Sequence, residues 1–172
     1  PALRVTHRLG ASTVAQDLVL RPGATGLEVR LDVDWRERAK ALVLTVDTDL
    51  RADESAAEIQ HGHVRRPVAE NTSWDAARYE VCAHRWLHVG ERGYGVAVAN
   101  DATYGHSVTR TVRDDEGGDG GTTKTVALTL LRSATYPDPR AEAGRHVRTV
   151  LVVPGADVAD AVVEGYRLNL AR

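Results

Sequence analysis

The sequence predicts an all-β fold, an antiparallel β-sandwich of the supersandwich type with about eleven short strands. Three observations support this prediction. Short runs alternate between apolar and polar residues, turn-forming residues separate the runs, and no stretch of ten residues shows the apolar spacing of an amphipathic helix. A chain of 172 residues and 18.6 kDa is long enough for one well-packed domain and too short for two. We therefore expect residues 1–172 to form a single domain.

The first half of the chain contains six predicted strands. In chain order they cover residues 3–9, 13–21, 27–35, 41–48, 56–60 and 78–83. The third is the clearest, because apolar residues from Leu27 to Trp35 alternate with charged residues, which gives the strand one apolar and one charged face. A turn sequence, Arg21-Pro22-Gly23, ends the second strand. Another, Arg65-Arg66-Pro67, follows the fifth strand.

The second half contains five more. They cover residues 94–99, 104–112, 122–132, 146–153 and 160–170. Turns precede the first, fourth and fifth of these strands, at Glu91-Arg92-Gly93, Pro137-Asp138-Pro139 and Pro154-Gly155. Residues 113–121 are acidic, rich in glycine and without an apolar side chain, so we expect a flexible loop there.

Composition excludes several classes of protein. Phe and Met are absent and Ile59 is the single isoleucine, so Val, Ala and Leu have to fill the core. The formal net charge of -2 gives no electrostatic basis for binding nucleic acid or an anionic membrane. No apolar run is long enough to span a bilayer. Cys82 is the only cysteine, which excludes an internal disulfide and favours a cytoplasmic location.

No residue pattern in the chain is typical of a catalytic or metal centre. His61 and His63 would share one face of a strand, but no set of Cys and His residues has the spacing of a zinc site. Cys82 stands in an apolar alternating run, which predicts a buried, inert thiol. The adjacent carboxylates Asp114 and Asp115 lie on the expected flexible loop, so they cannot keep the fixed separation of a glycosidase pair. We expect neither a catalytic residue nor a metal ligand in this chain.

Polar and aromatic residues gather at the expected ends of strands. Aromatic faces stack on sugars while amide and carboxylate groups bind the hydroxyls. On this ground the candidate substrate-binding residues are Asn71, Trp74, Tyr94, Asn100, Asp101 and Tyr104. Two other interpretations stay open: the aromatic residues are the only large side chains available for the core, and Asn and Asp also cap strand ends through local backbone bonds.

An ordered series of short motifs runs through the chain: Asp34-Trp35-Arg36-Glu37, Glu58-Ile59-Gln60, Arg66-Pro67, Asn71-Thr72-Ser73-Trp74, Ala83-His84-Arg85-Trp86, Gly93-Tyr94-Gly95, Asn100-Asp101, Tyr104-Gly105-His106, Leu130-Leu131-Arg132-Ser133 and Gly165-Tyr166. Taken together, these motifs resemble the C-terminal β domain of glycoside hydrolase family 38 α-mannosidases, over about residues 25–172. The resemblance is closest to the bacterial and fungal cytosolic-type branch. Two departures are His61, where such sequences often carry an aromatic residue, and Ala141-Glu142-Ala143-Gly144, where a polar pair is changed.

The resemblance implies that the chain is a non-catalytic part of a longer, retaining α-mannosidase. In that family an Asp nucleophile, a second carboxylic acid and a divalent metal, usually zinc, belong to an N-terminal catalytic domain. The expected partners are therefore that domain and an α-mannoside, and the expected role is to pack on the catalytic barrel and shape its cleft. An independent carbohydrate-binding module and a purely structural interaction domain are the alternatives.

Overall fold

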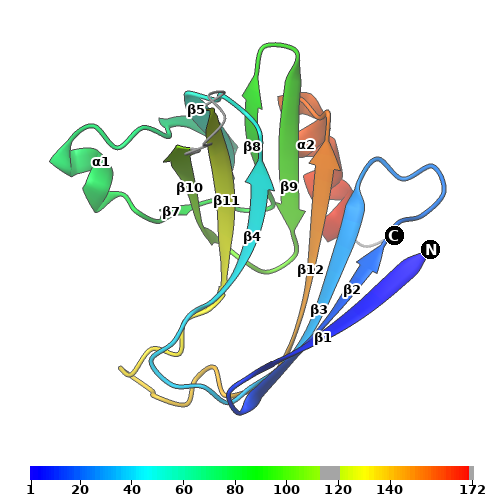
Figure 1. Ribbon diagram of the computed structural model, residues 1–172, viewed down its shortest axis with the longest axis vertical. Helices are drawn as coiled ribbons and strands as arrows, with labels where there is room; N and C mark the ends of the chain where they lie inside the picture. The colour runs from blue at the N-terminus through cyan, green and yellow to red at the C-terminus, as the bar shows by residue number, and fades with distance from the viewer. Residues whose placement is uncertain (113–120, 171–172) are drawn as a thin grey trace.

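A computed structural model describes residues 1–112 and 121–170 of the chain (Figure 1). It confirms the all-β prediction: within these residues, twelve strands form two antiparallel sheets. The loop expected at 113–121 lies outside the described residues except for Gly121. The elements are β1 (Ala2–Leu9), β2 (Ser12–Val19), β3 (Leu27–Trp35), β4 (Leu42–Thr48), β5 (Glu54–Ile59), β6 (Gly62–Pro67), α1 (Ser73–Ala77), β7 (Val81–Cys82), β8 (Trp86–Glu91), β9 (Tyr94–Asn100), β10 (Gly105–Val112), β11 (Thr122–Leu131), β12 (Gly144–Pro154) and α2 (Val158–Asn169).

The two sheets differ in size and in how their strands are connected. The larger has the order β1-β2-β3-β12-β9-β8-β5-β6, and the smaller has the order β4-β11-β10-β7. In Figure 1 the smaller sheet lies in front of the larger one, and α1 projects at the end of a long connection. Strand β12 pairs with β3 on one side and β9 on the other, so an element from near the end of the chain lies in the middle of the larger sheet.

The main core lies between the sheets and follows directly from the alternation in β3. Val29, Leu31, Val33 and Trp35 are all buried there, while the intervening charged residues face away. Strands β8, β9 and β11 supply further buried Leu and Val side chains to the same cluster. Because no Phe or Met is available, these medium-sized residues fill the space between the sheets.

A second, smaller core explains why β9 alternates valine with alanine. Val96 and Val98 point into the main core, whereas Ala97 and Ala99 point to the opposite face, where they pack with Trp86 and α2. Small side chains on that face let the helix approach the sheet closely. A Cβ atom placed on Gly165 of α2 would lie only 2.7 Å from Cδ1 of Trp86, so the glycine is needed for this contact.

The prediction of a strand at 160–170 is wrong, because this segment is the helix α2. Asp157 is its N-cap and forms a capping box with Asp160, in which each side chain accepts a hydrogen bond from the other residue's backbone N–H. Val162 and Val163 favour a strand locally, but packing of one helix face against the sheet outweighs that preference.

Three smaller differences concern β6, β7 and β8. β6 and β8 were not expected, and the strand expected at 78–83 is reduced to the two residues of β7, because Arg78 is the C-cap of α1 and the strand begins only at Val81. Cys82 was expected to be buried but is exposed, since it lies at the edge of the smaller sheet, where β7 pairs only with β10.

Candidate functional site

Asn100 holds together the turn that follows β9. Its side chain is 2% exposed. The amide Nδ2 donates to the carbonyl of His84 at 3.1 Å, and Oδ1 accepts from the backbone N–H of Thr103 at 2.7 Å. Asn169 of α2 donates to the backbone carbonyl of Asn100 at 2.9 Å. The Asn100 side chain is thus already engaged with local backbone, as expected for a residue that fixes a turn.

Asp101 and Tyr104 line a small surface pocket beside this turn. The carboxylate of Asp101 accepts a hydrogen bond from the backbone N–H of Thr149 at 2.9 Å. Tyr104 is 61% exposed, and its ring makes an edge contact with His84, with 5.7 Å between ring centroids. The pocket has a volume of about 170 Å³ and also contacts Arg85 and Asn169. It offers one exposed aromatic ring together with charged and amide groups.

An ion pair between Glu58 and Arg85 supports one wall of that pocket. Glu58 is buried, and its carboxylate accepts from the Arg85 backbone N–H at 2.8 Å and from Arg85 Nε at 2.9 Å. The Arg85 guanidinium lies 3.9 Å from the ring centroid of Tyr166. Burial acts to raise the pKa of Glu58, but the hydrogen bonds and charge of Arg85 outweigh it, so the pKa is lowered. The carboxylate therefore stays ionised and holds Arg85 in place.

The other candidate residues lie elsewhere. Tyr94 begins β9 whereas Asn100 ends it, and six steps along a strand separate them by about 20 Å. Asn71 and Trp74 belong to the segment of α1, where Thr72 is the N-cap in a capping box with Asp75. The structure therefore brings Asn100, Asp101 and Tyr104 together, but not Tyr94, Asn71 or Trp74.

Asn100→Ala is expected to lower the free energy of unfolding by about 1.5 kcal/mol, because the His84 carbonyl and the Thr103 N–H would lose their partner. Urea denaturation would measure this as a lower midpoint at unchanged slope. Asn71→Ala is the matched control, since Asn71 is exposed and its truncation should change stability by less than about 0.5 kcal/mol. Equal effects of the two substitutions would contradict a structural role for Asn100.

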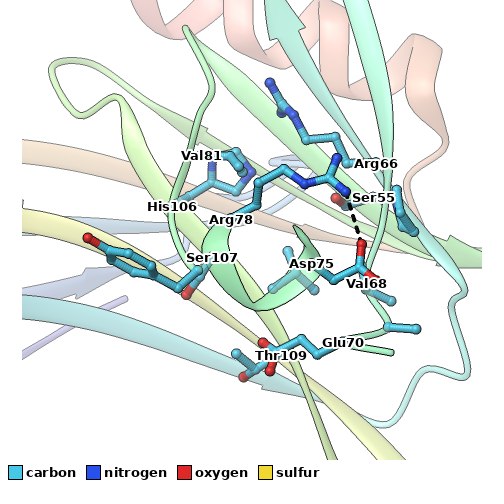
Figure 2. Close-up of a pocket in the computed structure, with 14 residues that line it drawn as sticks. Ser55, Arg66, Val68, Glu70, Asp75, Arg78, Val81, His106, Ser107 and Thr109 are labelled. Carbon is cyan, nitrogen blue, oxygen red and sulfur yellow. Dashed lines mark hydrogen bonds and ion pairs between the residues drawn. The ribbon is translucent and has the colours of Figure 1, made fainter. Parts of the chain in front are cut away.

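A second pocket lies beneath α1 and was not foreseen as a site. Figure 2 shows it with side chains from β6, α1 and β10 around it. Arg66, Arg78 and His106 are among the residues that line it. Arg66 and His106 both belong to motifs that carry the family resemblance. The alternation of apolar and polar residues along the strands did not indicate that the two would line one cavity.

The described residues do not fit a zinc ion. In residues 1–112 and 121–170, no group of three His, Cys, Asp or Glu side chains is placed to hold a metal. His61 has a positive φ of 64° in the turn between β5 and β6, whereas the ring of His63 lies 5.8 Å from that of Trp86. Within the same residues, neither helix is long and apolar enough to cross a membrane.

Comparison with known proteins places the chain in a family. The sequence profile described as "Glycosyl hydrolases family 38 C-terminal domain" matches residues 1–140. Alpha-mannosidase 2C1 of Homo sapiens is 37% identical over 143 residues, which are 83% of this chain and 12% of the human protein. Alpha-mannosidase G of Dictyostelium discoideum is 35% identical over 163 residues, 93% of this chain and 14% of that protein.

A solved structure shows the same fold. The crystal structure of an alpha-mannosidase from Enterococcus faecalis V583 aligns with 91% of this chain and 17% of its own, with a TM-score of 0.67 and 15% sequence identity. The chain thus spans only a small part of the length of each relative that it matches. From the profile match and the fold, the chain belongs to the family of C-terminal domains of family 38 glycosyl hydrolases.

Proposed function

We propose that this chain is the non-catalytic C-terminal domain of a retaining α-mannosidase, that it packs on the catalytic domain, and that it shapes the cleft that binds terminal α-mannosides. In this proposal the nucleophile, the general acid and any divalent metal belong to the catalytic domain, outside the chain. The exposed free thiol of Cys82 is compatible with a cytoplasmic location for the enzyme.

The observation that carries the proposal is the exposure of aromatic side chains. The chain has five Tyr and three Trp, and all five tyrosines together with Trp74 are exposed. Trp74 is 79% exposed and Tyr79 is 73% exposed, although both are among the largest apolar side chains in a sequence without Phe. Aromatic residues are enriched at the centres of protein interfaces. The segment of α1 therefore offers a suitable contact for a second domain.

Trp74→Ala is expected to destabilise the complete enzyme by about 1–2 kcal/mol through loss of an interface anchor. The same substitution in the 172-residue chain should change stability by less than about 0.5 kcal/mol, because Trp74 is exposed there. Thermal unfolding of both proteins, with and without the substitution, measures the difference. Equal small effects in the two would count against a contact at α1.

The alternative function is an independent carbohydrate-binding module. The pocket at Tyr104 allows this alternative to be tested. Calorimetric titration of the 172-residue chain with methyl α-mannoside would show binding that Tyr104→Ala abolishes if the alternative holds. Under our proposal the chain alone does not bind methyl α-mannoside. Tyr104→Ala then has an effect only in the complete enzyme, where it lowers kcat/KM for the mannoside.

A further inference from the structure

The pocket beneath α1 is a small, partly open cavity with a lining of mixed polar and apolar residues from both sheets. Arg66 comes from β6 of the larger sheet, His106 from β10 of the smaller sheet, and Arg78 from the end of α1 (Figure 2). Hydroxyl groups of Ser55 and Ser107 also line it. Three separate parts of the fold thus contribute polar side chains to one cavity.

Two of these side chains have buried nitrogen atoms that make no well-formed hydrogen bond. His106 is 0% exposed, and its two ring nitrogens lie only near the backbone of Tyr104 and Val81. The Nη1 atom of Arg66 is likewise buried without an acceptor. Buried polar groups nearly always have a partner, so such atoms call for a ligand or an ordered water.

Two arginines, Arg66 and Arg78, and two acidic residues, Glu70 and Asp75, line the cavity. Arg78 is neutralised by Asp75, to which its Nη2 donates at 2.9 Å, the dashed contact in Figure 2. Within residues 1–112 and 121–170, no carboxylate forms an ion pair with Arg66. A partly buried cation with no ion-pair partner is costly. An anion in the cavity would relieve it.

The size of the cavity restricts what it can hold. Its volume is about 50 Å³, enough for a few water-sized groups and far below the roughly 300 Å³ or more of typical ligand pockets. A sugar ring is therefore excluded, whereas a carboxylate group has two oxygens that match the paired N–H groups of a guanidinium. A neutral imidazole supplies one further N–H donor.

We propose that the pocket beneath α1 binds a single carboxylate group, which accepts hydrogen bonds from Arg66 and His106. The group comes either from a small free carboxylate or from an Asp or Glu side chain of a part of the enzyme outside this chain. Both sources present the same chemistry to the pocket. The inference stands independently of the function proposed above.

Titration of the 172-residue chain with sodium acetate tests the proposal, with sodium chloride at equal ionic strength as reference. The ring signals of His106 in ¹H–¹³C NMR spectra, assigned with His106→Gln, are expected to shift saturably with acetate and not with chloride. Arg66→Gln should weaken acetate binding about tenfold or more, because it removes a charge-assisted hydrogen bond. Arg65→Gln is the matched control, since Arg65 is exposed on the same strand and should leave binding unchanged.

Absence of a saturable shift, or an equal response to chloride, would overturn the proposal and leave water as the partner of His106. The wild-type comparison gives this answer even if Arg66→Gln fails to fold. In the complete enzyme, a His106 signal that responds to acetate identifies a free carboxylate as the ligand. A signal already at its shifted position and insensitive to acetate identifies a side chain of the same enzyme.

Discussion

Trp86→Ala is expected to lower the free energy of unfolding by about 3–5 kcal/mol. The side chain is 2% exposed and fills the space between the larger sheet and α2, where it contacts Gly165. Alanine would leave a cavity beside residues that are already small, Ala56, Ala97 and Ala99. These residues cannot expand to fill the cavity, so the cost should lie in the upper part of the range for core truncations. Chemical denaturation followed by circular dichroism measures it.

Trp74→Ala provides the control, because it removes the same atoms from a side chain that is 79% exposed. In the 172-residue chain it should shift the denaturation midpoint very little. Equal losses in the free energy of unfolding for the two substitutions would contradict the packing of α2 against Trp86.

Acidification from pH 6.5 to pH 4 is expected to remove about 3 kcal/mol of stability through His106 alone. Burial and, to a smaller extent, the charge of Arg66 lower the pKa of this histidine to about 4, against the opposing effects of Glu80 and of the backbone of Tyr104 and Val81. Above pH 6.5 the imidazole is neutral in both the folded and the unfolded chain. Between pH 6.5 and 4 the unfolded chain binds a proton that the folded chain does not, so unfolding becomes more favourable. Below pH 4 both states are protonated and the loss stops.

About 2 kcal/mol of this loss should already be present at pH 5, before carboxyl groups, with ordinary pKa values of about 4, begin to titrate. Urea denaturation at pH 7 and at pH 5 measures it. His106→Gln should largely abolish the difference between the two pH values, whereas the exposed His7→Gln should preserve it. An unchanged pH dependence in His106→Gln would show that another group is responsible.

The sequence was most informative where one physical factor dominates. The strand from Leu27 to Trp35 was predicted to the residue, because one face packs into the core and the other does not. The helix α2 was missed, because its valines resemble a strand and Gly165 is a poor helix former. The capping box of Asp157 and Asp160 was the available signal. A glycine is required at position 165 because the helix packs against Trp86 there. The two residues are far apart in the sequence, so no local pattern shows this contact.

Contacts between residues far apart in the sequence also limit how well the candidate sites could be predicted. Asn100, Asp101 and Tyr104 line one pocket, since they follow one another around a single turn. Tyr94 was grouped with them although it stands at the other end of β9. Arg66 and His106 lie in different sheets, so only the packing of one sheet on the other brings them to one cavity, and no local pattern encodes that packing.

The position of β12 between β3 and β9 affects how the protein folds as it is made. While the ribosome is still synthesising the segment before Gly144, the two halves of the larger sheet have no strand to join them. β3 and β9 then each present an unpaired edge, and unpaired strand edges can pair with other chains. Pairing across more than a hundred residues, as between Trp35 and Gly144, is slow to form. The nascent chain is therefore prone to aggregate until β12 has been synthesised and pairs with both β3 and β9.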